Sequence, residues 1–211
     1  MLDRGGVGEP ARGSGEHGGE CDPVHRGAML TRAHGATVEW PGEFKNHGSM
    51  IVVVMGVTGA GKTAVGQRLA VALDAEFIDA DDYHAPENVA KMRAGAPLTD
   101  ADRWPWLAQL NGMLREREAG GRSAVLACSA LKAAYREALL EELPDARVVH
   151  LRGAKPLIAS RLAGRRGHYM NPGLLESQFA ALEEPADAIV VDIGGTPDAI
   201  VAAVLGQLRP V

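Results

Sequence analysis

Cysteine is nearly missing from this chain of 211 residues, which contains only Cys21 and Cys128. Cys21 lies among polar residues and Cys128 in an apolar run, so the sequence predicts no disulfide framework and favours the reducing cytoplasm. No run approaches the ~18 consecutive apolar residues of a membrane-spanning helix. The first thirty residues lack the apolar middle of a secretory signal. We therefore expect a cytoplasmic protein with no membrane partner.

Aromatic residues are also scarce, at 4% of the sequence, so the core should consist mainly of Val, Leu, Ala and Ile. There is no basic excess either, because 22 Lys and Arg stand against 27 Asp and Glu, a formal net charge of −5. Sequence-independent binding of nucleic acid needs a net basic surface, so no nucleic-acid partner is expected. A local basic pocket for an anionic small molecule is compatible with this charge.

The composition changes near Met50. Residues 1–49 contain eleven of the 26 glycines and four of the seven histidines, with almost no apolar periodicity. Such a segment cannot bury enough surface to offset its chain entropy, so we expect it to be disordered and the folded domain to span 50–211. It is either a regulatory tail or translated sequence upstream of a start at Met29 or Met50. The position of Met50 directly before the first expected strand favours the second alternative.

From residue 50 onward, short apolar runs alternate with helical patterns. Strands are expected at 51–55, from 76 onward, and at 124–128, 148–151 and 189–193. Helices are expected at 63–73, from 86 to a stop at 95–97, from a cap at Asp100 or Asp102 through 114, at 132–143 before Pro144, from 156 to 162, at 174–182 and at 197–208. The alternation predicts an α/β domain with a five-stranded parallel sheet covered by helices on both faces, and no internal repeat.

A phosphate-binding loop follows the first expected strand. Residues 56–63 fit G-x-x-x-x-G-K-[ST] between a strand and a helix, the context that this motif requires. Backbone amides in such a loop and the positive end of the next helix bind phosphate oxygens. The pattern predicts a nucleoside triphosphate, with Lys62 at the β- and γ-phosphates and Thr63 on Mg²⁺. The nucleotide-binding residues expected here are Gly56, Thr58, Gly59, Ala60, Gly61, Lys62 and Thr63.

Two carboxylates follow the second expected strand, Asp79 and Asp81. Ligands in open α/β sheets bind at the carboxyl ends of the strands, and residues two apart on a strand share a face. Asp79 is therefore a candidate for holding Mg²⁺, and Asp81 for accepting the proton of an attacking hydroxyl or orienting it. The alternative is that both side chains only cap the turn that follows.

Longer motifs make the sequence resemble the gluconate kinase family over residues 50–208. The most specific are 97–103, which reads P-L-x-D-x-D-R, and 128–132, which reads C-S-A-L-K. The family commonly has Ser where this chain has Thr58 and Thr63, and both changes keep a hydroxyl. The resemblance implies transfer of the γ-phosphoryl group of ATP, with Mg²⁺, to the terminal hydroxyl of D-gluconate. It also implies a P-loop kinase fold like that of shikimate and nucleoside-monophosphate kinases, with a lid.

Gluconate has a carboxylate and many hydroxyls, so its site needs cations and hydrogen-bonding side chains. Arg103 and Arg136 are the stronger carboxylate anchors because a guanidinium can form two parallel bonds. Each cation could instead be a solvated surface residue, and Trp104 and Trp106 are expected to be packing residues. The candidate substrate-binding residues are Asp81, His84, Asn88, Lys91, Arg103, Lys132, Arg136 and His168.

Residues 161–168 have the composition of a lid, with arginines between glycines that allow bending. Arg161 is expected to bind the nucleotide, and Arg165 to stabilise the transferring phosphoryl group as a catalytic residue. His168 could equally be a lid histidine without a ligand.

Two rival functions remain open. The first is a kinase of the same fold for shikimate, a nucleotide or an antibiotic hydroxyl, although residues 129–132 lack the glycine triplet of shikimate kinases. The second is a nucleotide-binding regulator without phosphotransfer, which the presence of Lys62, Thr63, Asp79 and Asp81 together argues against. The sequence leaves the oligomeric state open, with a homodimer as one alternative.

Overall fold

A computed structural model of the chain describes residues 48–164 and 172–208. All of them lie in the second of two units into which the chain divides, Trp40–Val211. Most of the expected tail, 1–47, is outside the described residues, as are residues 165–171, which include 165–168 of the expected lid. Within the described ranges, no helix is long and apolar enough to cross a membrane.

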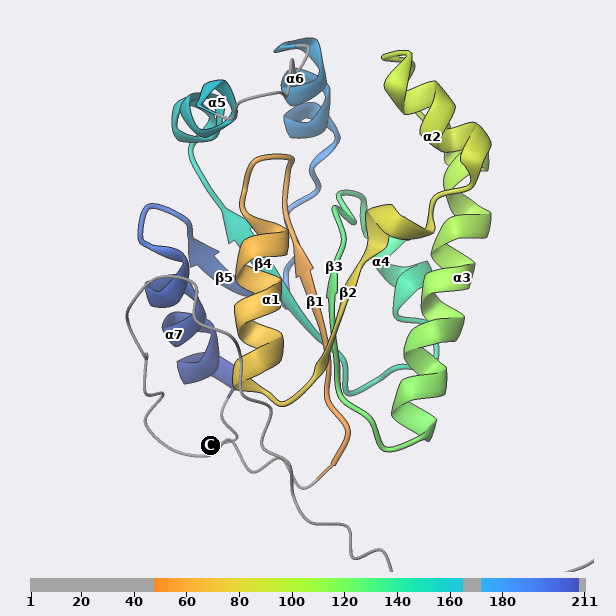
Figure 1. Cartoon of the computed structure of the whole chain (residues 1–211), viewed down its shortest axis with the longest axis vertical. Helices are drawn as coiled ribbons and strands as arrows, with labels where there is room; N and C mark the ends of the chain where they lie inside the picture. The colour runs from red at the N-terminus through yellow and green to blue at the C-terminus, as the bar shows by residue number, and fades with distance from the viewer. Residues whose placement is uncertain (1–47, 165–171, 209–211) are drawn as a thin grey trace, which may run out of the picture. The chain divides into compact units, whose positions relative to one another are not determined.

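Five parallel strands form one sheet in the order β2-β3-β1-β4-β5, which confirms the predicted fold class (Figure 1). Short Val-rich runs bounded by turns favour such buried strands. The strands are β1 Ile51–Met55, β2 Glu76–Asp79, β3 Ala124–Ala127, β4 Arg147–Arg152 and β5 Ile189–Asp192.

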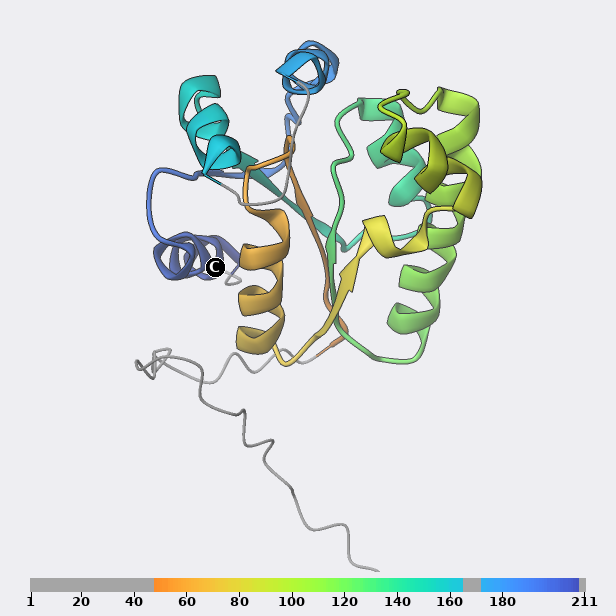
Figure 2. The same cartoon turned by 45° about the horizontal axis from the view of Figure 1, so that its top comes forward.

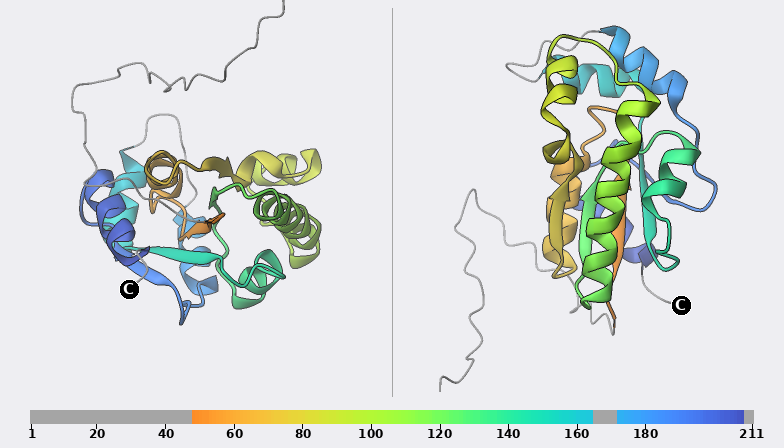
Figure 3. Two further views of the ribbon diagram at one scale, coloured as in Figure 1. Left: turned by 90° about the horizontal axis from the view of Figure 1, so that it is seen from below. Right: turned by 90° about the vertical axis from the view of Figure 1, so that its right-hand side faces the viewer.

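Helices cover both faces of this sheet. Figure 2 shows α1 and α7 on one side of the strands and α3 on the other, and the left view of Figure 3 shows the same separation. A short 3-10 helix, η1, follows β2. The helices are α1 Lys62–Ala72, η1 Ala80–Tyr83, α2 Pro86–Arg93, α3 Asp100–Ala119, α4 Ala133–Leu139, α5 Lys155–Ala163, α6 Pro172–Ala181 and α7 Pro197–Leu208.

The alternation of side chains along β1 explains why the sheet needs two helical layers. Val52 and Val54 pack with α1 and α7, whereas Ile51, Val53 and Met55 pack with α3 and α4. All five side chains are buried. Successive residues of a strand point to opposite faces, so a strand apolar at every position must be covered twice.

Two predicted helix ends are wrong. The N-cap of α3 is Thr99, not Asp100 or Asp102, because Thr99 has extended backbone and accepts from the Asp102 amide while Asp102 bonds back. The helix expected at 132–143 ends at Leu139. Buried Asn111 donates to the carbonyl oxygens of Leu139 and Glu141 at 3.0 and 2.8 Å, which stabilises this early end.

The topology fixes where a ligand site can lie. β1 and β3 are neighbours, but the helix that follows β1 packs on one face and the helix that follows β3 packs on the other. Their two connections therefore diverge at the carboxyl edge of the sheet and leave a crevice between them. In open α/β sheets this switch point is the usual ligand site.

Candidate active site

The loop between β1 and α1 is shaped by glycines. Gly59 and Gly61 have φ angles of +80° and +99°, which side-chain-bearing residues rarely adopt. A Cβ on Gly59 would lie 2.8 Å from the Leu162 side chain, so the loop also needs glycine for close packing. α1 begins at Lys62, and no side chain caps this end among the residues described. Its first amides and its positive dipole end are therefore directed toward the crevice as an anion site.

The Lys62 side chain folds back toward the first residues of its own loop. Its Nζ donates to the carbonyl oxygens of Gly56 and Val57 at 3.0 and 3.2 Å. This arrangement keeps the ammonium group beside the loop amides, so cation and amides face the same space. The structure thus brings together the residues that the motif predicts for the β- and γ-phosphates.

Thr63 and Asp79 connect the phosphate loop to the end of β2. The Thr63 Oγ1 donates to the Asp79 Oδ2 at 2.9 Å. A hydroxyl and a carboxylate are hard oxygen donors, and Mg²⁺ is usually held by one or two such groups with water and phosphate oxygens. Over residues 48–164 and 172–208 no group of three or more His, Cys, Asp or Glu side chains could hold a metal ion. The pair therefore fits Mg²⁺ only as a site shared with nucleotide.

Asp81 does not lie on the strand face that the sequence predicted it to share with Asp79. β2 ends at Asp79, and Asp81 belongs to η1, so the two carboxylates do not share a strand face. The Asp79 side chain accepts from the Asp81 amide at 3.2 Å and caps η1. Asp79 thus caps the turn, as the alternative expected, but the same side chain also reaches Thr63, and its role toward Mg²⁺ stays a prediction. The Asp81 carboxylate is 82% exposed, which leaves it accessible to an acceptor molecule.

His84 lies directly beside Asp81, with its Nε2 3.8 Å from the Asp81 Oδ1. Its ring stacks on Trp106 at 4.3 Å between centroids, and its side chain is only 5% exposed. The Trp106 indole donates to the Ala80 carbonyl at 2.9 Å, so the stack is anchored to η1. Burial lowers the pKa of His84, Asp81 opposes this effect, and Arg103 adds to it. The imidazole is therefore held neutral near physiological pH.

A cationic cluster stands on the other side of His84, made by Arg103, Lys132, Tyr135 and Asp100. Lys132 donates to both Asp100 oxygens at 3.0 and 2.9 Å, and the Tyr135 hydroxyl donates to Asp100 at 2.5 Å. Arg103 donates to the Tyr135 hydroxyl at 3.3 Å and lies 3.6 Å from Asp100. The hydrogen bond from Tyr135, followed by that from Lys132, lowers the pKa of Asp100. Two cations facing one ionised carboxylate leave a local charge of +1.

Lys91 and Asn88 belong to a separate network around the start of α3. Lys91 donates to the Asp102 carboxylate at 2.6 Å, and the buried Asn88 side chain donates to the Asp102 carbonyl at 3.0 Å. The Lys91 bond and then the Thr99 bonds lower the pKa of Asp102 to about 2. These contacts hold α2 against α3.

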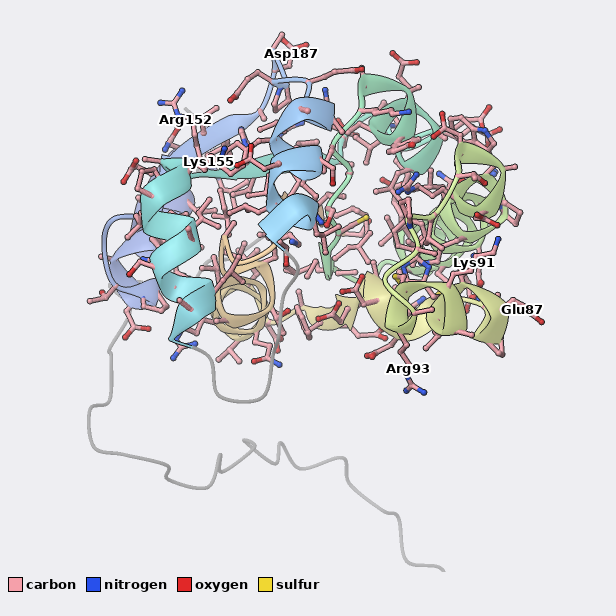
Figure 4. The ribbon with its side chains drawn as sticks, turned by 90° about the horizontal axis from the view of Figure 1, so that it is seen from above. Glu87, Lys91, Arg93, Arg152, Lys155 and Asp187 are labelled. Atoms are coloured by element: carbon pink, nitrogen blue, oxygen red, sulfur yellow. The ribbon has the colours of Figure 1, made fainter. Side chains whose placement is uncertain are left out.

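In Figure 4, which looks down on the carboxyl edge, Lys91 and Glu87 lie on the α2 side, away from Arg152 and Lys155.

Arg136 supports the loop after β3. It donates to the carbonyl oxygens of Ala130 and Leu131 at 3.1 and 3.0 Å. Ala130 has a φ angle of +41°, so these bonds hold a strained backbone in place. Burial lowers the pKa of Arg136. The expected roles of Arg136, Lys91 and Asn88 toward substrate remain predictions.

A cavity of ≈ 290 Å³ adjoins the phosphate loop on the α7 side. Arg161 lies in its wall and donates to the Ile193 carbonyl at 2.5 Å. Its lining is mainly small and apolar with one arginine, a composition that suits the apolar faces of a nucleotide base. Arg165 and His168 lie outside the described residues. The lining residues are Ala60, Gly61, Ala64, Val65, Arg161, Gly195, Pro197 and Ile200.

The sequence arguments missed the residues that organise the cations. Asp100 and Tyr135 bind Arg103 and Lys132, two of the candidate substrate-binding residues, but Asp100 was considered only as a motif letter and a helix cap, and Tyr135 was given no role. A usable signal existed, because Asp100 lies three residues before Arg103 and Tyr135 three residues after Lys132, a spacing that places side chains together. The contact between the two pairs is tertiary and carries no local pattern.

Known proteins share both this architecture and these motifs. The AAA domain family model matches residues 51–185. A probable gluconokinase from Rattus norvegicus is 46% identical over 181 residues, which cover 75% of this chain and 97% of that protein. A solved gluconokinase from Sinorhizobium meliloti is 42% identical with a TM-score of 0.68, covering 77% of this chain and 92% of its own. A solved sugar kinase from Janibacter is 43% identical with a TM-score of 0.71, covering 76% and 94%. At this identity and coverage, the chain belongs to the gluconokinase family of P-loop kinases.

Proposed function

We propose that the protein transfers the γ-phosphoryl group of ATP to the terminal hydroxyl of D-gluconate and forms 6-phospho-D-gluconate. One combination of residues carries the proposal: the phosphate loop follows β1, the exposed Asp81 follows β2, and Arg103 and Lys132 form a cluster with a local charge of +1. The names of the relatives support the choice of gluconate. The local charge of +1 matches a monocarboxylate.

The nucleotide half would work mainly by positioning. The loop amides and Lys62 bind the β- and γ-phosphates, and the base occupies the cavity beside Arg161 and Pro197. Thr63 and Asp79 would hold Mg²⁺, which when bound neutralises charge on the phosphates. Little covalent chemistry is asked of the protein in phosphoryl transfer, so alignment and charge account for most of the rate.

The acceptor half would bind the two ends of gluconate separately. Its carboxylate accepts from Arg103 and Lys132, sharing these cations with Asp100, while its terminal hydroxyl reaches the Asp81 carboxylate. Asp81 then orients the hydroxyl and takes its proton as the new oxygen–phosphorus bond forms, while the bond from the γ-phosphorus to the bridging oxygen breaks and ADP leaves. His84, held neutral by burial, donates or accepts a hydrogen bond without adding charge beside the base.

The other predicted residues have supporting parts in this proposal. Arg136 keeps the loop after β3 in shape for Lys132, and Lys91 with Asn88 keeps α2 closed on α3. Arg165 is proposed to stabilise the transferring group, and His168 to contact the acceptor.

The proposal is tested by measuring ADP release from ATP with a panel of acceptors at equal concentration. D-gluconate should give the highest kcat/KM, and neutral D-glucose should be poorer by at least about tenfold because it lacks the carboxylate. Shikimate and a nucleoside monophosphate represent the same-fold rivals. A higher kcat/KM for either one would contradict the proposal. ATP binding without turnover on any acceptor would favour the regulatory alternative.

A further inference from the structure

A side chain from α6 reaches the phosphate loop. The Thr58 backbone amide donates to the Gln178 Oε1 at 2.6 Å, across 120 residues of sequence. Both residues are half-buried. Thr58 lies in the loop and outside any helix or strand, so this amide has no ladder partner. A half-buried amide without a partner is unfavourable, and Gln178 satisfies it.

The same peptide unit is held from its other side. The carbonyl of Val57 and the amide of Thr58 belong to one rigid peptide plane. Lys62 and the Ala60 amide both donate to that carbonyl at 3.2 Å, and Gln178 accepts from that amide. Rotation of the plane would break these three bonds together. Gln178 therefore contributes to the orientation of the Val57–Thr58 peptide and, through the Val57 carbonyl, to the position of Lys62.

The end of α6 is also tied to the acceptor side. The Glu183 amide donates to the Leu131 carbonyl at 2.9 Å, and the Glu183 carboxylate accepts from the Ala133 amide at 2.6 Å. Leu131 and Ala133 flank Lys132, one of the two cations of the acceptor pocket. Between these ties, Phe179 and Leu182 pack against the core. One short segment, 178–183, thus forms hydrogen bonds to backbone groups of both the phosphate loop and the loop after β3.

We propose that Gln178 is a positioning residue for phosphoryl transfer. It fixes the Val57–Thr58 peptide so that Lys62 and the loop amides face the phosphates in one arrangement, and Glu183 fixes the acceptor loop from the same segment. The inference rests on the proposed function, because it assigns the alignment of the two reactants to α6. Misplacement of reacting groups by about 1 Å can lower a rate by roughly 10²-fold.

Two variants separate the hydrogen bond from the bulk of the side chain. Gln178→Met keeps the length and removes the acceptor, whereas Gln178→Glu keeps an acceptor and adds a negative charge near the phosphates. Gln207→Met, on the exposed face of α7, is the matched control for the substitution itself. For each full-length protein we would measure the exchange rate of the Thr58 amide proton by NMR, together with kcat, both KM values and the melting temperature.

In Gln178→Met the Thr58 amide should exchange at least about tenfold faster, since its bond is gone. Its kcat should fall by about 10- to 100-fold, with the KM for gluconate within about twofold of wild type and the melting temperature nearly unchanged. Gln178→Glu should restore protection of Thr58 and most of kcat, and should raise the KM for ATP. Gln207→Met should match wild type in every readout.

Three results would overturn the inference: unchanged Thr58 exchange in Gln178→Met, a kcat within twofold of wild type, or a lowered melting temperature with unchanged turnover per folded molecule. A wild type that does not phosphorylate gluconate would refute the proposed acceptor instead. In that case the inference is decided by Thr58 exchange and by slow hydrolysis of ATP to ADP without acceptor. Loss of Thr58 protection together with loss of ATP hydrolysis in Gln178→Met would support it, and retention of either one would overturn it.

Discussion

The phosphate half of the crevice is made of backbone, whereas the acceptor half is made of side chains. Around Lys62, the groups that face the ligand are loop amides and a helix end, and they come from eight consecutive residues. Around Arg103, the groups come from two helices and pair with one another through Asp100 and Tyr135. The first half attracts an anion through a helix end and one lysine, while the cations of the second half are already paired with Asp100.

This difference has consequences for binding. The loop contains no acidic side chain that could compete with phosphate for the amides at the helix end, so phosphate binds to a preorganised site. In the acceptor pocket, a substrate carboxylate must share Arg103 and Lys132 with Asp100, and only the net charge of +1 attracts it. Tight nucleotide binding and weaker, more selective acceptor binding are expected from such a pair of sites.

The largest effect on turnover should follow from removing Lys62, the cation of the phosphate half. Lys62→Ala removes the charge at the β- and γ-phosphates while the loop glycines keep the backbone shape. We expect kcat to fall by ~10³-fold or more, with the circular dichroism spectrum unchanged. Steady-state assays with gluconate and ATP measure this. Near-normal turnover in a folded variant would remove Lys62 from the mechanism.

Two substitutions test whether Asp79 serves the phosphate half and Asp81 the acceptor half. Asp81→Asn should lower kcat by ~10²–10⁴-fold and leave nucleotide affinity almost unchanged, because it removes only the proposed base. Asp79→Asn should instead raise the Mg²⁺ concentration needed for half-maximal rate, since Asp79 contacts Thr63. Rates measured against Mg²⁺ distinguish the two. The reverse pattern would exchange their roles, and equal mild effects would mean that neither is catalytic.

The acceptor half is tested by comparing two cations that differ in their pairing. Arg103→Lys keeps the charge but loses the planar fork, so the KM for gluconate should rise by about tenfold with little change for ATP. Lys91→Met should leave the gluconate KM within about twofold, because Lys91 is paired with Asp102 outside the cluster. If Arg103→Lys changes the KM for ATP and leaves the KM for gluconate unchanged, Arg103 serves the nucleotide half instead.

A smaller, pH-dependent effect should come from His84. Its pKa in the fold is below the usual 6.5, so the unfolded chain binds the proton first as pH falls. The free energy of unfolding should therefore decline as pH falls through about 6.5 toward the folded pKa. His84→Phe keeps the stack on Trp106 and should flatten this decline. Urea unfolding at several pH values measures it, and an identical pH dependence in the variant would show that His84 does not titrate this way.

The smallest effect is expected outside both halves. A chain that starts at Met50 loses only the bond from the Ser49 hydroxyl to the Glu118 carbonyl among the contacts of residues 48–49 with the domain. Turnover should match the full chain, and the melting temperature should stay within about 2 °C. A large loss of either would show that residues 1–49 contribute to the working enzyme.

The same contrast decides what could be predicted from sequence. The phosphate loop is contiguous, and its chemistry follows from spacing, so its residues and its flanking strand and helix were predictable. The β1 run and the strand–helix alternation likewise gave the sheet. The acceptor half depends on pairs such as Asp100 with Tyr135, which lie 35 residues apart, and the bond from Thr58 to Gln178 that supports the phosphate loop spans 120 residues. No local periodicity encodes such contacts.

Local competition explains the smaller errors. Thr99, Asp100 and Asp102 are all good capping residues, and extended backbone at Thr99 decides among them. The Asp79–Asp81 spacing suggested a strand face, but η1 begins directly after Asp79 and turns the chain. In both cases the residue types were correct and the backbone conformation was the missing information.

Product identity tests the central claim most directly. The protein is incubated with ATP, Mg²⁺ and D-gluconate, and the products are examined by ³¹P and ¹³C NMR. The account predicts ADP and one phosphomonoester, with phosphorus coupling to the terminal carbon of gluconate, because the carboxylate is held at the Arg103–Lys132 end and the other end reaches Asp81. Phosphate on a carbon next to the carboxylate would contradict this orientation. Inorganic phosphate as the only phosphorus product beside ADP would contradict the kinase itself.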